Sequence, residues 1–99
     1  MTQTILSCNI AGISHARPDF SVLSIDDEVT LVLEPQNEFD PRAIRVQHKD
    51  AGKLGYVPKE STICIRDAVD NGFELFTRLQ SFNDSGKWPK IHLVVTIDI

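Results

Sequence analysis

The chain has 99 residues, 41% of them hydrophobic, and a formal net charge of −4 at pH 7. A chain of this length forms one compact core rather than two, and it has little room for a catalytic cleft with separate cofactor and substrate lobes. The acidic balance argues against broad, non-specific adhesion to nucleic acid, which needs a basic surface. We therefore expect a single domain over residues 1–99 that binds a ligand and is not an enzyme.

The average charge conceals two regions of opposite sign. Residues 18–41 carry seven acidic side chains and no Lys or Arg, whereas residues 42–66 carry six basic and two acidic side chains. Exposed strands and loops often show such unevenness without any further purpose. The alternative is that residues 42–66 form a local basic face for phosphate.

The remaining composition points to a reduced, metal-free protein. Cys8 and Cys64 are far apart, form no C-x-x-C motif and are too few for a disulfide framework. His15, His48 and His92 make no metal-ligand pattern with each other or with the cysteines. The N-terminus has no positive leader region, and no apolar run approaches the roughly 18 residues that span a bilayer. We expect a cytoplasmic protein without membrane attachment, metal or cofactor.

The first third of the chain predicts two strands joined by a loop. Residues 4–13 alternate apolar and polar side chains as a half-buried strand does. Residues 14–27 read as a loop that packs back onto the body, with Phe20 as its anchor. Residues 29–33 form a short aliphatic run that predicts a buried second strand, which Pro35 ends.

The middle of the chain predicts a β-hairpin followed by a helix. Residues 43–48 and 53–57 alternate, and turn residues lie between them. Pro58 suits the first turn of a helix, because the missing N–H is not needed there. Apolar residues three and four apart continue the helix, and Asn71-Gly72 is a natural C-terminal cap.

Two further strands, 73–82 and 90–99, are predicted at the C-terminal end, with an exposed turn between them. The last strand is expected to bury one face, formed by its alternate aliphatic residues from Ile91 to Ile99. Six short strands and one short helix indicate a mainly β chain that forms a small, closed or nearly closed OB-like β-barrel.

The loop and hairpin in the middle of the chain carry a motif. Residues 37–46 read Asn-Glu-Phe-Asp-Pro-Arg-Ala-Ile-Arg-Val, and residues 52–60 read Gly-Lys-Leu-Gly-Tyr-Val-Pro-Lys-Glu. They resemble the signature of the HIRAN family, in which an Asn-Pro-Tyr-Asp-Pro-Asn-Ala-Ile-like turn leads into a hairpin ending in Gly-Tyr-Leu-Pro-Arg/Lys-Glu. Similar residues at 10–13 and 28–35 extend the resemblance over nearly the whole chain.

The resemblance implies a DNA-binding module. HIRAN domains occur on eukaryotic fork-remodelling translocases and as small stand-alone bacterial proteins, and the former type holds the 3′ end of single-stranded DNA. This chain carries no motor domain and resembles the stand-alone bacterial kind.

Three residues of the motif suit a DNA end. A carboxylate in a small pocket accepts a hydrogen bond from a terminal 3′-hydroxyl, whereas a 3′-phosphate would bring negative charge against it. We assign this role to Asp40. Phe39, where the family often has Tyr, can stack on the terminal base for about 1–3 kcal/mol. The resemblance places Lys59 at the start of the helix to meet a phosphate, and Phe82 as another wall of the site.

One position departs from the family pattern. The DNA-binding translocase members have an Arg-Tyr pair after the first strand, and this chain has Ser14-His15. His15 can still stack on a base, and Arg17 is near enough in sequence to replace part of the missing charge. With Arg42 also near the phosphates, we expect DNA binding that is weaker than in those members, or a different ligand.

Purely structural interpretations of the same residues stay open. Asp40 before Pro41 can cap a turn that Asn37 ties to the backbone. Phe39 can belong to the core. Tyr56, a second-rank candidate for the binding site, can instead be a packed hairpin residue with a hydrogen-bonded hydroxyl.

Two functions follow from these residues. The leading one is a non-catalytic module that binds 3′-hydroxyl ends of single-stranded DNA at stalled or damaged replication sites, as part of DNA repair. The competing one is a protein-interaction or self-associating adaptor, in which the last strand or the turn at Trp88 contacts a protein partner or a second copy.

Overall fold

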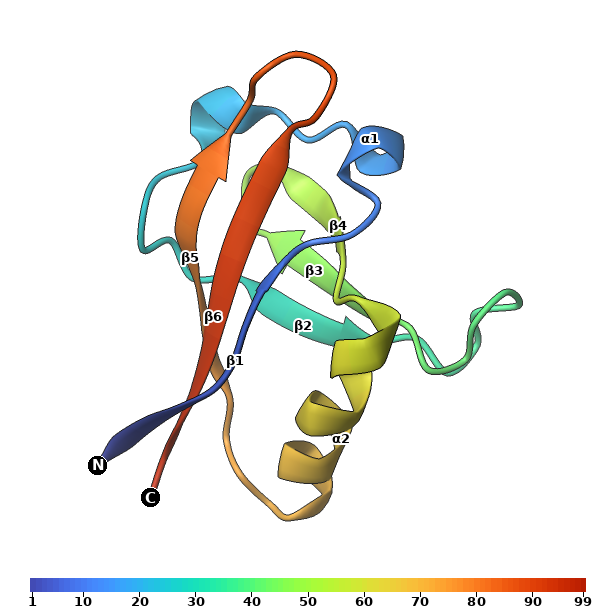
Figure 1. The fold of residues 1–99 in the computed structure, drawn as a ribbon. Helices are drawn as coiled ribbons and strands as arrows, with labels where there is room; N and C mark the ends of the chain where they lie inside the picture. The colour runs from blue at the N-terminus through green and yellow to red at the C-terminus, as the bar shows by residue number, and fades with distance from the viewer.

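The structure, a computed structural model, describes residues 1–99 and contains six strands in two antiparallel sheets of three (Figure 1). The first sheet has the order β1-β6-β5 and the second the order β2-β3-β4. The strands are β1 (Thr2–Asn9), β2 (Thr30–Leu33), β3 (Ile44–His48), β4 (Gly52–Tyr56), β5 (Phe76–Asn83) and β6 (Lys90–Asp98). The mainly β class and the β3–β4 hairpin are confirmed.

The sheets do not close into one barrel, so the predicted closure is wrong. Strand pairing joins them only at two isolated bridges, one between Ala11 and Tyr56 and the other between Glu28 and Arg78. The physical reason lies in β2, which leaves β5 after Val29 in order to pair with β3. The two sheets therefore pack on one shared hydrophobic core and are joined by backbone pairing at two points, with an opening between β2 and the start of β5.

Gly55 permits the first of these bridges. The backbones of Ala11 and Tyr56 exchange two hydrogen bonds of 2.8 Å. A Cβ atom on Gly55 would overlap the Ala11 carbonyl oxygen and lie 2.6 Å from the Cγ2 atom of Ile10. Only glycine lets the two backbones approach this closely, and its φ of +152° is also outside the range that other residues favour.

The helix predicted after Pro58 is confirmed. A 3₁₀ turn, η2 (Lys59–Ser61), leads into α2 (Thr62–Asp70), and Gly72 follows its end with a φ of +82°. The Sγ atom of Cys64 donates a hydrogen bond to the Ile5 carbonyl at 3.1 Å, which fixes α2 against β1.

The segment predicted as a loop contains two short helical turns, α1 (Ile13–Ala16) and η1 (Phe20–Val22). The first strand ends at Asn9 rather than at Ile13, because the chain leaves β6 after Ile10 and pairs with β4 at Ala11. Phe20 packs against the core and its ring meets that of Phe82 edge-on, at 6.2 Å between centroids. Its predicted role as the anchor of the segment is confirmed.

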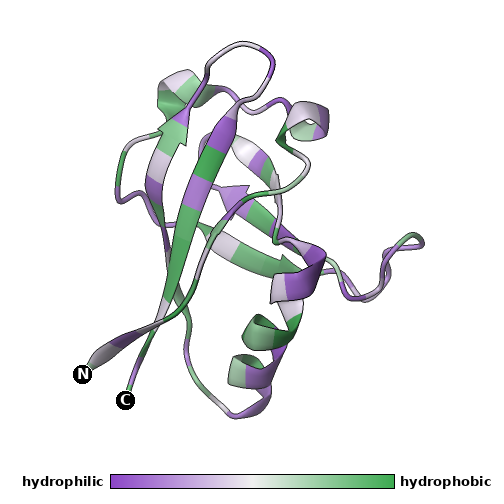
Figure 2. Cartoon of the chain, in the orientation of Figure 1, coloured by the Kyte–Doolittle hydropathy of each residue, from purple (hydrophilic) through white to green (hydrophobic).

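The last strand, β6, is the central strand of its sheet and is more deeply buried than predicted. Figure 2 shows that most of its residues are hydrophobic. Val94 and Thr96 are buried as well as the aliphatic residues of the opposite face, whereas Ile99 is 61% exposed. Both edges of β6 are paired, to β1 and to β5. A partner cannot add to this strand, and that part of the adaptor interpretation is wrong.

Candidate nucleic-acid interface

The side chain of Asn37 makes three hydrogen bonds within the loop between β2 and β3. Its Oδ1 atom accepts hydrogen bonds from the backbone N–H groups of Phe39 and Asp40, at 2.9 and 3.0 Å. Its Nδ2 atom donates to Glu34 Oε1 at 3.0 Å. The loop projects from the body of the molecule (Figure 1), and Asn37 presets the backbone on which the two candidate ligand residues are carried.

Asp40 has a structural role and a free oxygen. Its Oδ1 atom accepts a hydrogen bond from the Arg42 amide at 2.9 Å, which caps the turn before β3. The side chain is half-buried, and Oδ2 has no partner within the protein. The turn interpretation is therefore confirmed, and one carboxylate oxygen is still available to a ligand.

Tyr56, the last residue of β4, connects the loop to the hairpin through a side-chain hydrogen bond. Its hydroxyl donates to Glu34 Oε1 at 3.0 Å, and Lys53 Nζ lies 4.5 Å from the centre of its ring. The hydrogen bond from Asn37, followed by the bond from Tyr56 and the charge of Arg45, lowers the pKa of Glu34 below its ordinary value. Tyr56 is thus a half-buried hairpin residue with a bonded hydroxyl, as the structural interpretation held.

A cavity of about 330 Å³ opens beside this loop, and we call it the loop pocket. Four of the eight predicted site residues line it, namely Phe39, Asp40, Tyr56 and Lys59. The other lining residues are Ala11, Gly12, Asn37, Ala43 and Val57. The bridge at Ala11 brings the end of the first sheet to this place, so the pocket lies where the two sheets meet.

Phe39 is 96% exposed at the loop pocket. The interpretation of Phe39 as a core residue is therefore wrong. An aromatic ring that is almost wholly in solvent, carried on a loop braced by side-chain hydrogen bonds, offers an open face for stacking.

The other four predicted residues lie outside the loop pocket. His15 belongs to α1 and Arg17 follows its end; both are exposed, and α1 starts directly after Gly12 of the pocket. Arg42 is exposed on the projecting loop. Phe82 packs on Phe20 and the core, so the structure places it away from the pocket it was expected to wall.

A second cavity, of about 250 Å³, shares Gly12 with the loop pocket and was not foreseen as part of this site. The second is lined by Trp88, which is 78% exposed, and by Lys87 and Lys90 on either side of it in the chain. Together the two linings hold three lysines and a single carboxylate, Asp40. In the sequence, the feature that could have located this second cavity is an exposed aromatic residue between two lysines in a predicted turn.

The HIRAN domain profile matches residues 4–99. The chain belongs to the HIRAN domain family. HIRAN domains are known as DNA-binding modules with an OB-like fold and are generally non-catalytic. No curated protein sequence matches this one.

Two solved structures share the fold of this HIRAN domain. A protein from Lactobacillus plantarum superposes with a TM-score of 0.74 at 18% identity, over 99% of this chain and 98% of that one. The HIRAN domain of human HLTF superposes with a TM-score of 0.71, also at 18% identity, over 97% of this chain and 78% of that one. None of the helices is long and apolar enough to cross a membrane.

Proposed function

We propose that this HIRAN domain is a non-catalytic module that binds the 3′-hydroxyl end of single-stranded DNA in the loop pocket. The observation that carries the proposal is the pairing of a half-buried carboxylate, Asp40, with the exposed ring of Phe39 in one small cavity. Free 3′ ends of this kind occur at stalled or damaged replication sites, and this is the setting we propose.

Asp40 supplies end recognition through its free oxygen. A terminal 3′-hydroxyl can donate a hydrogen bond to Oδ2, while Oδ1 stays engaged with the Arg42 amide. A hydrogen bond to a charged acceptor contributes about 1.5–3 kcal/mol. A 3′-phosphate, or a strand that continues past this point, would place negative charge against the same carboxylate and be repelled.

The strand leading to the end would pass from the loop pocket over Gly12 to Trp88. Phe39 stacks on the terminal base and Trp88 on a base further along, each for about 1–3 kcal/mol and without reading the base identity. Lys59 serves the phosphate that links the last two nucleotides, and Lys87 and Lys90 serve the phosphates near Trp88. In this way the chain concentrates basic residues on one face despite its net charge of −4.

Ser14 and His15 adjust the affinity of this interface. Ser14 lines the second cavity, and neither residue supplies the guanidinium that the translocase members have at this position. Arg17 and Arg42, both exposed, provide charge nearby. We expect binding that weakens steeply with added salt, because each phosphate contact releases bound counterions.

The experiment is fluorescence anisotropy with two single strands that differ only in a 3′-hydroxyl or a 3′-phosphate. We expect the phosphate to weaken binding by about tenfold, from the loss of one charge-assisted hydrogen bond. Asp40→Asn keeps an oxygen for the Arg42 amide but loses the charge, so the difference between the two ends should shrink. Asp70→Asn, an exposed carboxylate at the end of α2, is the matched control. Equal affinity of the wild type for both ends would contradict end recognition.

A further inference from the structure

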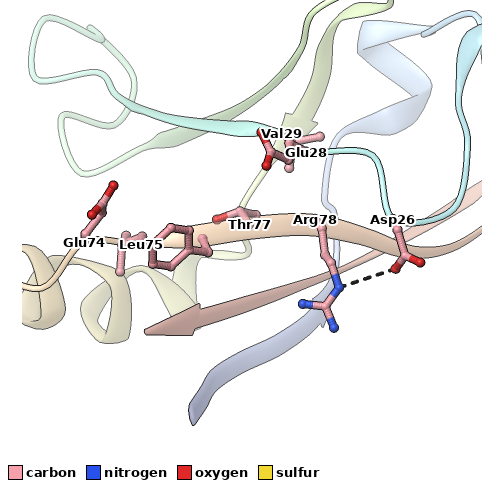
Figure 3. A pocket seen from close by; sticks show the side chains of 8 residues that line it. Asp26, Glu28, Val29, Glu74, Leu75, Thr77 and Arg78 are labelled. Atoms are coloured by element: carbon pink, nitrogen blue, oxygen red, sulfur yellow. Dashed lines mark ion pairs between the residues drawn. The ribbon is translucent and has the colours of Figure 1, made fainter. Parts of the chain in front are cut away.

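The two sheets separate between β2 and the start of β5. Backbone hydrogen bonds join the chain before β2 to β5, with Leu79 N donating to Asp27 O at 2.9 Å and Val29 N to Thr77 O at 3.0 Å. Beyond Val29 the two segments diverge around a cavity of about 380 Å³. Figure 3 shows Glu28 and Val29 on one side of this opening and residues 74–78 on the other. We call it the β2–β5 cleft.

The cleft is bordered by backbone groups without partners. In an antiparallel pair, successive residues point their N–H and C=O groups alternately toward the neighbouring strand and away from it. Glu34 N donates to Ala43 O of the β3 side at 3.0 Å, so the backbone groups of Leu31 and Leu33 point away from β3. They form an unpaired edge that continues beyond Val29, the residue of this segment that lines the cleft. Across the cleft, Thr77 uses its carbonyl for Val29 while its N–H has no acceptor.

Neither β6 nor β1 offers a comparable edge. Both edges of β6 are paired. The free edge of β1 has α2 beside it, and its Ile5 carbonyl already accepts a hydrogen bond from Cys64. An unpaired edge that borders a cavity is a template on which an extended peptide can add as a further strand.

The charges of the cleft select its occupant. Three carboxylates line it, those of Asp26, Glu28 and Glu74, against one guanidinium, that of Arg78. Arg78 pairs with Asp26 at 3.4 Å, which leaves two carboxylates without a basic partner (Figure 3). Phe76, 45% exposed, adds an apolar surface beside them. An acidic lining repels DNA and favours a peptide with Lys or Arg next to apolar residues.

A second copy of the chain fits this cleft less well. Antiparallel pairing of β2 with itself, centred on Leu31, would place Glu28 of each copy opposite Glu34 of the other. Like charges across a strand pair are destabilising. The charges therefore favour a partner protein over self-association.

We propose that the β2–β5 cleft binds an extended, basic segment of a partner protein by strand addition to the Leu31–Leu33 edge. The added strand donates to and accepts from the backbone of these two residues. Its apolar side chains pack beside Phe76, and its Lys or Arg side chains face Glu28 and Glu74. The loop pocket and its DNA end take no part in this contact, so the domain could bind DNA and a protein at once.

The test uses a synthetic peptide, Lys-Lys-Val-Thr-Val-Thr-Val-Lys-Lys, and a control peptide in which Glu replaces every Lys. We expect the basic peptide to bind in calorimetry and to slow hydrogen exchange at the amides of Leu31 and Leu33. Leu33→Pro removes an edge N–H that no other strand uses and should weaken binding by about tenfold or more. Leu33→Thr keeps that N–H and is the matched control, with affinity near that of the wild type.

A second variant keeps the test independent of any folding defect caused by proline. The double substitution of Glu28→Gln and Glu74→Gln removes two surface charge pairs with the peptide and should weaken binding of the basic peptide several-fold. The affinity for 3′-hydroxyl DNA should be unchanged. The proposal would be overturned if the basic peptide did not bind, if the Glu peptide bound equally well, or if a folded Leu33→Pro variant bound the basic peptide as well as the wild type. It would also be overturned if light scattering showed a dimer whose Leu31 and Leu33 amides are protected from hydrogen exchange without peptide.

Discussion

Replacing Gly55 by alanine tests the idea that one close backbone approach joins the two sheets. The added Cβ atom meets the Ala11 carbonyl oxygen and Ile10 Cγ2, both on a segment that is fixed by hydrogen bonds to Tyr56 and to Ile91. Neither contact is the flexible end of a long side chain, so the clash cannot be relieved without moving the backbone. The bridge between the sheets must then open or shift.

The cost has two parts. Overpacking against a fixed neighbour destabilises by about 1–3 kcal/mol. Forcing a non-glycine residue into a sparsely populated region, at the φ of +152° found for Gly55, adds about 1–3 kcal/mol. A total near 3–4 kcal/mol is a large part of the stability of a small domain and corresponds to a fall in Tm of about 12 °C or more.

Gly52→Ala is the matched control for this change. Gly52 also has a positive φ, of +74°, but the nearest atom to an added Cβ is Gln47 Nε2 at 3.8 Å. It should therefore lose only the conformational part, about 1–2 kcal/mol. Urea unfolding followed by far-UV circular dichroism measures both variants. If Gly55→Ala unfolds at the same urea concentration as Gly52→Ala, the close approach to Ala11 is not what constrains this position.

The other predictions concern the side chains that hold the site and the hairpin. The hydrogen bond from the His48 imidazole, at 2.8 Å, is the main cause that lowers the pKa of Asp27. A carboxyl group with a lowered pKa stabilises the folded state above about pH 4. This contribution is lost as the pH falls through the pKa of the folded state. Asp27→Asn should therefore lose less stability than the wild type between pH 7 and pH 3 in urea unfolding, and an equal loss would speak against the pair. Asn37→Ala removes the acceptor for two loop amides and should cost about 1–2 kcal/mol; it should also weaken 3′-end binding in anisotropy, and unchanged affinity would mean that the loop is positioned by other contacts. Tyr56→Phe removes the hydroxyl bonded to Glu34 and should lower the free energy of unfolding by about 1 kcal/mol, whereas a variant as stable as the wild type would show that this bond has no net effect.

The elements of the fold that depend on local patterns were predictable. Alternation of apolar and polar residues located the β3–β4 hairpin, and proline and glycine marked the two ends of α2. The start of α1 was not predictable, because Ile13 continues the apolar pattern of β1 and only the departure of the chain toward β4 ends that strand. Alternation shows that a strand has a buried face, but it cannot show that β6 is buried on both.

For the site, the sequence alone determined the family motif and, through it, the loop that carries Phe39 and Asp40 together with the return at Tyr56 and Lys59. These residues lie close along the chain or face each other across one hairpin, so local geometry brings them together. Which other segments join them depends on long-range packing. Placing Trp88 beside Gly12, moving Phe82 away and leaving the β2–β5 cleft open all depend on how the two sheets are set against each other. That arrangement follows from contacts between residues far apart in the chain, such as the approach of Ala11 to Gly55, which no local pattern records.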